Sequence, residues 1–150
     1  MSRTLLLSLH LLAAAFWIGG MAFAHLCLRP AAVSVLAPPQ RLPLWAAVLG
    51  RFLPRVGLAV LVLLASGQAL VMAAGGWAGV PPGWHVMAGV GGAMAVIYLV
   101  IQLRLWPRLR DHCAVSAWPE AAAVQDRIRR LVSVNLLLSL VVVGAALWAR

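Results

Sequence analysis

The chain has no lysine, only three acidic residues, and 10% charged residues in all, against about a quarter in an ordinary soluble domain. Hydrophobic residues make up 64% of its 150 positions. So little polar surface cannot coat a water-soluble globule, and a chain this apolar also lacks the composition of a disordered segment. Its net charge of +9 comes from arginines. In so apolar a sequence, arginines indicate the ends of membrane spans rather than nucleic-acid binding.

Several kinds of chemistry are also missing from the sequence. Cys27 and Cys113 are too few for a disulfide framework, and neither belongs to a C-x-x-C pair. There is no Walker motif, no zinc-ligand spacing and no Ser–His–Asp set. The long apolar runs contain no carboxylate, which excludes a proton relay of the usual acidic kind.

Four uncharged runs are long enough, at about 18 residues or more, to cross a hydrocarbon core of ~30 Å. Because backbone groups in lipid must be satisfied within one segment, these runs are expected to be helices. The sequence therefore predicts a single-domain, all-α integral membrane four-helix bundle over residues 1–150. Its predicted spans are 4–28, 56–74, 84–103 and 131–149.

The arginines predict the orientation of the bundle. The connections 29–55 and 104–130 hold ten arginines, whereas the opposite side has only Arg3 and Arg150. By the positive-inside rule, both arginine-rich connections lie in the cytoplasm and both termini lie outside, in a bacterial inner membrane. Residues 118–130 are expected to form an amphipathic cytoplasmic helix, with an acidic residue near its start and arginines near its end.

Histidines inside membrane spans indicate a functional site. His10 lies 19 residues before Arg29, and His85 lies 19 residues before Arg104, on spans that run in parallel. These equal offsets of about 28 Å predict that both imidazoles lie at similar depth near the outer face. His25 lies about 22 Å further in and cannot share one ion with them.

Small residues follow both histidines on the same helical faces. They include Ala14, with Trp17, after His10, and Gly89 and Gly92 after His85. Such faces suit a flat macrocycle with one imidazole on each side of iron, which predicts haem b with His10 and His85 as axial ligands. The same small residues would also let helices pack closely without any cofactor.

Copper is the alternative guest, and it requires soft sulfur beside imidazole. Met87 and Met94 share a helical face, although that face is offset from His85. The remaining candidates, Met21, Met72 and Cys27, are scattered in sequence. Three functions stay open: electron transfer or redox handling by a haem b protein, copper uptake or resistance through the same histidines or His25, and a cofactor-free structural subunit.

A series of short motifs runs along most of the chain. In order they are Leu9-His10-Leu11-Leu12, Phe16-Trp17-Ile18-Gly19-Gly20-Met21, Leu28-Arg29-Pro30, Pro38-Pro39-Gln40-Arg41-Leu42, Arg51-Phe52, Ser66-Gly67, His85-Val86-Met87, Arg129-Arg130-Leu131-Val132 and Asn135-Leu136. Together they resemble the CopD-like family of small bacterial membrane proteins (copper resistance D domain). The resemblance implies a four-helix bundle in the inner membrane and a role in copper uptake or resistance.

The chain is also distantly similar to the HemJ-type protoporphyrinogen oxidases, which share a first-helix histidine, and this likeness implies haem b. That group is expected to have a lysine shortly after a third-helix histidine, whereas this chain reads His85-Val86-Met87 and has no lysine. The difference argues against the oxidase activity and leaves haem binding open. The expected partner is the lipid bilayer; a homodimer, a quinone and the electron donor and acceptor stay undetermined.

Overall fold

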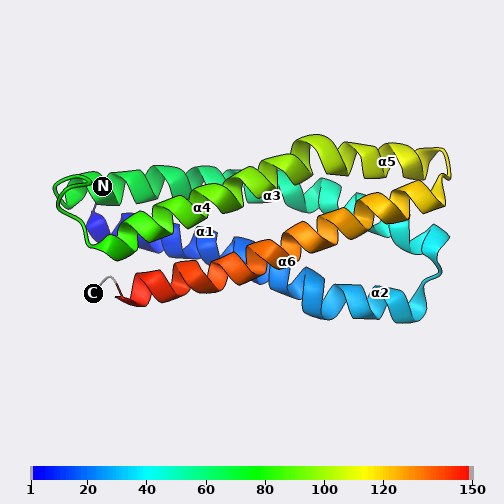
Figure 1. The fold of residues 1–150 in the computed structure, drawn as a ribbon, viewed down its shortest axis with the longest axis horizontal. Helices are drawn as coiled ribbons and strands as arrows, with labels where there is room; N and C mark the ends of the chain where they lie inside the picture. The colour runs from blue at the N-terminus through cyan, green and yellow to red at the C-terminus, as the bar shows by residue number, and fades with distance from the viewer. Residues whose placement is uncertain (1, 149–150) are drawn as a thin grey trace.

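The computed structural model describes residues 2–148, and within them the chain is helical with no strand (Figure 1). The first half comprises α1 (Arg3–Phe23), the π-helical turn η1 (Ala24–Leu28), α2 (Arg29–Val35) and α3 (Pro38–Ala73). The second half repeats this order with α4 (Pro82–Val100), the π-helical turn η2 (Ile101–Leu105), α5 (Trp106–Ala114) and α6 (Trp118–Trp148).

Four continuous helical segments are long and apolar enough to cross a membrane, and they run over Arg3–Val35, Pro38–Ala73, Pro82–Ala114 and Trp118–Trp148. Large apolar side chains such as Leu12, Leu61 and Leu137 are exposed on their outer faces, as expected for surfaces that contact lipid. The predicted all-α, four-helix membrane bundle is therefore confirmed. Its orientation with both termini outside stays a prediction.

The segments 29–55 and 104–130 differ from the expected connections because both are mostly helical. Their prolines stand largely in the first turns of helices, as at Pro38, Pro39 and Pro119, where a missing N–H breaks no hydrogen bond. Each long segment thus continues beyond its apolar span as an arginine-bearing extension. Ala149, the end of the predicted fourth span, lies outside the described residues.

Both π-helical turns end two residues before a proline. A proline ring clashes with the carbonyl four residues earlier and supplies no N–H to it. The chain accommodates Pro30 and Pro107 by widening one turn. The N–H of Arg29 then donates to the carbonyl of Ala24, five residues back, and the N–H of Trp106 donates likewise to Ile101.

The bundle core lies where the first half of the sequence (α1 to α3) packs against the second half (α4 to α6). Helix α1 packs along α3, and α4 packs along α6. The Trp17 ring meets Tyr98 edge-on, with centroids 6.4 Å apart, and the Tyr98 hydroxyl donates to the Leu53 carbonyl at 3.2 Å. Asn135 Nδ2 donates to the carbonyl of Met94 at 3.3 Å. Tryptophan, tyrosine and amide side chains thus link α1, α3, α4 and α6 across the interior.

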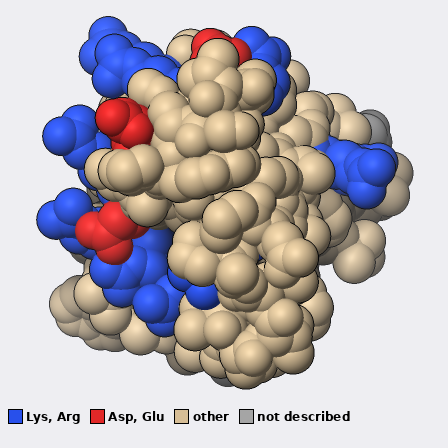
Figure 2. All heavy atoms as spheres, turned by 90° about the vertical axis from the view of Figure 1, so that its right-hand side faces the viewer, with Lys and Arg blue, Asp and Glu red and all other residues tan. Residues whose placement is uncertain are grey.

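The two ends of the bundle differ in charge. One end carries α2, α5 and the first turns of α3 and α6, and we call it the arginine-rich end. Figure 2 looks onto this end and shows arginines gathered over it with the few acidic side chains among them. The opposite, arginine-poor end carries the start of α1, the connection between α3 and α4, and the last turns of α6 (Figure 1).

Candidate functional site

His10 is the histidine that a second span holds in place. Its Nδ1 lies 2.9 Å from the Oγ of Ser66 in α3. Its Cε1 lies 3.3 Å from the position that a Cβ on Gly67 would occupy, so the absence of a side chain there lets the ring lie against α3. Ser66 is buried and His10 is half-buried. The imidazole is therefore fixed between two helices in the half of the bundle next to the arginine-poor end, which we call the arginine-poor half; the other is the arginine-rich half.

Ser66 also determines which ring nitrogen of His10 carries the proton. A serine hydroxyl has one proton to donate, and Ser66 Oγ donates it to the carbonyl of Val62 at 2.5 Å. With its proton directed to Val62, the oxygen accepts from His10, and we infer from this network that Nδ1 is protonated and Nε2 keeps its lone pair. Metal-binding histidines are typically oriented by such a bond from the other ring nitrogen. His10 is thus arranged to bind a metal ion through Nε2.

His85 has different surroundings. It is exposed near the start of α4, and its ring lies against Trp77 of the connection between α3 and α4, with centroids 5.4 Å apart. No group of three or more histidine, cysteine or acidic side chains that could hold a metal occurs within residues 2–148. His10 thus contacts α3, whereas His85 contacts the connection between α3 and α4.

The other residues predicted to contact a cofactor lie in unlike environments. Trp17 is buried in the core and Ala14 is half-buried. A Cβ added at Gly89 or Gly92 would meet nothing within 4 Å, so the face of α4 that follows His85 has open space beside it.

The sulfur ligands divide into buried and exposed groups. Met21 and Met94, which are scattered in sequence, both belong to the buried core cluster. Met72 and Cys27 are exposed, and Met87 is half-buried. The structure thus places two thioethers, from α1 and α4, in the interior of the bundle. The sequence named Met21 as a candidate ligand but did not pair it with Met94; its i+4 spacing from Trp17 puts it on the same buried face of α1.

A cavity of about 440 Å³ lies in the arginine-rich half between η1, α3 and α6. Most of its wall is apolar or aromatic, with Trp45 and Phe52 contributed by α3. His25, the alternative metal ligand, lines it together with Met21. No spacing of residues reveals this cavity, because its walls come from helices far apart along the chain.

Two residues of α6 that line this cavity each have a buried amide oxygen with no hydrogen-bond donor among the residues described. These oxygens are Oε1 of Gln125 and Oδ1 of Asn135. The Asn135 side chain is 1% exposed, and its Nδ2 is already directed to Met94. A buried acceptor without a donor costs about 1–3 kcal/mol, so a guest that donates a hydrogen bond would be stabilised here.

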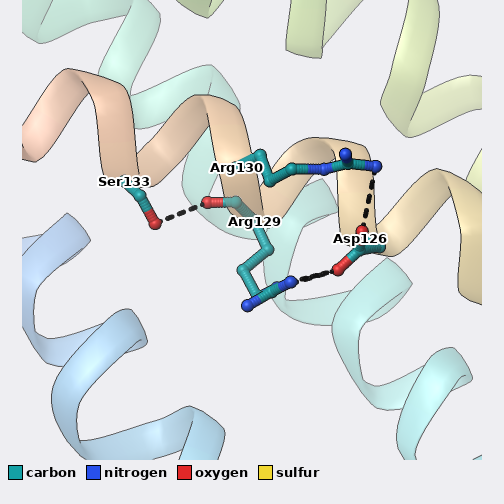
Figure 3. A network of polar contacts seen from close by, with 4 residues as sticks. All are labelled: Asp126, Arg129, Arg130 and Ser133. Atoms are coloured by element: carbon teal, nitrogen blue, oxygen red, sulfur yellow. Dashed lines mark hydrogen bonds and ion pairs between the residues drawn. The ribbon is translucent and has the colours of Figure 1, made fainter.

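Charged side chains surround the mouth of the cavity. Figure 3 shows Asp126 between two arginines of its own helix: Arg129 donates to one carboxylate oxygen, and Arg130 lies 3.0 Å from the other. The hydrogen bond from Arg129, together with the charges of Arg129, Arg130 and Arg29, lowers the pKa of Asp126. Since Arg29 begins α2, the arginines that influence this carboxylate come from both sides of the cavity.

Comparison with models of protein families matches residues 46–149 to copper resistance protein D. The matched segment includes Ser66, His85 and Asn135, whereas His10 and His25 precede it. No curated protein and no solved structure matches the chain. The similarity to HemJ-type oxidases therefore stays a prediction. Because the match extends over well more than half of the sequence, this four-helix membrane protein belongs to the copper resistance protein D (CopD) family.

Proposed function

We propose that this CopD-family protein binds copper in the arginine-poor half of the bundle, with Nε2 of His10 as a ligand, in the course of copper uptake or resistance. The observation that carries the proposal is the contact of Ser66 with His10 Nδ1, which leaves Nε2 with a free lone pair. Imidazole and thioether are both ligands that copper accepts, and thioethers favour Cu(I). With both termini outside, as the arginines predict, this half would face the periplasm.

Two further sets of donors extend the proposed site. His85, on the exposed start of α4, would supply a second imidazole. Met21 and Met94 would supply thioethers deeper in the bundle, where both are buried. An ion held first by histidine and then by methionine would meet progressively softer ligands along the interior.

A competition titration with a chromophoric Cu(I) chelator tests the proposal on the detergent-purified chain. His10→Ala should lose most of the affinity, and His85→Ala should weaken it. His112→Ala is the matched control because His112 lies at the arginine-rich end, in α5, and its affinity should equal that of the wild type. Unchanged copper affinity in His10→Ala would refute the proposed ligand. Copper accumulation in cells that express the same variants then relates binding to uptake or resistance.

Haem b is the second candidate, with His10 and His85 as axial ligands and electron transfer or redox handling as the role. The open space beside Gly89 and Gly92 favours it, because a macrocycle edge requires such a face. A visible spectrum with metal analysis on one sample separates the candidates: a Soret band and iron indicate haem, and copper without a Soret band indicates the first proposal. If the sample holds neither iron nor copper in a stoichiometric amount, the remaining function is that of a cofactor-free structural subunit.

Two variants sharpen the haem test. Gly89→Leu would place a branched side chain in open space, so the fold should persist while haem occupancy falls and copper affinity stays unchanged. His25→Ala should leave a His10–His85 haem spectrum intact. Loss of the Soret band in His25→Ala, with His10→Ala retaining it, would instead move the haem to the arginine-rich half, where His25 lines the cavity.

A further inference from the structure

We propose that the cavity in the arginine-rich half binds one anionic phospholipid from the adjoining leaflet. Its phosphate would lie among Arg29, Arg41 and Arg129, and one acyl chain would follow the apolar wall. The histidines of the proposed copper site lie in the opposite half; Met21 lines this cavity, but it is not among the side chains proposed to hold the phosphate.

The position of the cavity gives access from the membrane. Its walls come from η1 and α2 on one side and from α6 on the other, with α3 behind. Figure 1 shows α2 standing apart from α6, and the contacts of α2 are mainly with the η1 turn that precedes it. Because α2 follows directly on a membrane span, the space between α2 and α6 lies at the level of the lipid headgroups. At about 440 Å³ the cavity has the size of sites that enclose small apolar ligands.

The charge of the mouth selects an anion. Arg29, Arg41 and Arg129 all line the cavity and all are half-buried. Asp126 is the acidic side chain in the lining, and its carboxylate is already paired with Arg129 and Arg130. Arginine binds phosphate through paired, charge-assisted hydrogen bonds. The excess of positive charge here therefore matches the phosphate of a lipid rather than a cation.

The remaining polar group at the mouth favours a headgroup with hydroxyls. Gln125 lies one residue from Asp126, and its buried Oε1 has no donor among residues 2–148. Rotation of the Gln125 side chain would present this oxygen to the cavity, where the hydroxyls of a glycerol headgroup can donate to it, whereas a choline headgroup has no hydrogen-bond donor. Phosphatidylglycerol supplies both the anion and the donor.

The interior of the cavity suits an acyl chain. From Asp126 the cavity follows α6 to Asn135, nine residues or about 13 Å further along the helix. Between these polar groups the α6 lining residues are Ile128 and Val132, besides Arg129. On the opposite wall Trp45 and Phe52 add aromatic surface. A single apolar chain that enters at the mouth would be covered along this length.

Native mass spectrometry of the full chain in nanodiscs of mixed phosphatidylcholine and phosphatidylglycerol tests this proposal. The wild type should retain one phosphatidylglycerol in preference to phosphatidylcholine. The double variant Arg29→Gln/Arg41→Gln should lose that preference, by about fivefold for each arginine removed. The matched control, Arg108→Gln/Arg127→Gln, removes two exposed arginines from the same end that do not line the cavity, and it should retain the lipid.

Two results would overturn the proposal. One is equal retention of the two lipids by the wild type. The other is equal loss of phosphatidylglycerol in the control and in the cavity variant, because the arginines would then act only as a general surface charge. Inorganic phosphate added to the same sample should not displace the lipid, since the acyl chain contributes to binding; displacement would assign the site to a free anion. Copper affinity, measured on the same variants, should stay unchanged.

Discussion

Ser66→Ala is the sharpest test of the metal site, because it removes one oxygen and no charge. In the wild type, Ser66 Oγ accepts from Nδ1 of His10 at 2.9 Å and thereby keeps the proton away from Nε2. Without that acceptor the imidazole is free to rotate and to place its proton on either nitrogen. Loss of such an orienting partner typically lowers metal affinity by about 10- to 100-fold, or about 1.4–2.7 kcal/mol. We expect copper affinity to fall by that amount, while His10→Ala should lower it further.

The assay is a Cu(I) competition titration, and Ser139→Ala is its control. Ser139 is also buried and also donates to a carbonyl of its own helix, that of Leu136, but no histidine contacts it. Both variants lose a local hydrogen bond to a carbonyl of their own helix, and Ser66→Ala also loses the contact with His10, so both should stay folded, with Ser66→Ala unfolding at the lower temperature. Only Ser66→Ala should lose copper affinity. If the two variants bind copper equally well, the orienting role of Ser66 is wrong, whatever metal the protein carries.

Two further predictions concern packing and orientation. Gly57→Ala should lower the free energy of unfolding by about 1–3 kcal/mol, because the new Cβ would lie 2.5 Å from the hydroxyl of Tyr98 in the core, and thermal unfolding in detergent measures this. Gly19→Ala should be tolerated, since nothing lies within 4 Å of the added atom. A reporter fused after Trp77 should be active in the periplasm, and one fused after Ala114 in the cytoplasm. Reversal of these two signals would contradict the orientation given by the arginines.

The four spans could be predicted from the sequence because membrane helices follow from composition alone. Uncharged runs of sufficient length leave the backbone no alternative to helix in lipid. The helical extensions at the arginine-rich end were predicted only in part, since the arginines and prolines of these segments indicate connections between spans rather than helices. Pro38 and Pro119 act as helix starts rather than breakers, and Pro30 is absorbed by the π-helical turn η1. Hydropathy does not contain this information, which depends on the position of each proline within its turn.

The candidate site was less predictable than the fold. His10 was a candidate because it lies inside a predicted membrane span. The sequence gives no means to pair it with Ser66, which is 56 residues away. The protonation of its ring follows from that pairing alone. In the same way, Asn135 is a polar residue in an apolar run, which the sequence shows plainly. That Asn135 lines a cavity and that its oxygen is buried without a donor among residues 2–148 depend on how α6 packs against α3 and η1.

The distribution of arginines along the bundle favours a cation at one proposed site and an anion at the other. His10 lies about 28 Å along its helix from Arg29, where each arginine repels a unit cation by about 0.6 kcal/mol at an effective dielectric constant of 20. At about 5 Å from the arginines of the mouth, the same repulsion would be about 3 kcal/mol for each of them. A copper ion is therefore held more easily beside His10 than in the cavity lined by Arg29, Arg41 and Arg129. An anion prefers the cavity for the same reason. The uneven arginines that predict the orientation of the bundle thus also separate a cation site in one half from an anion site in the other.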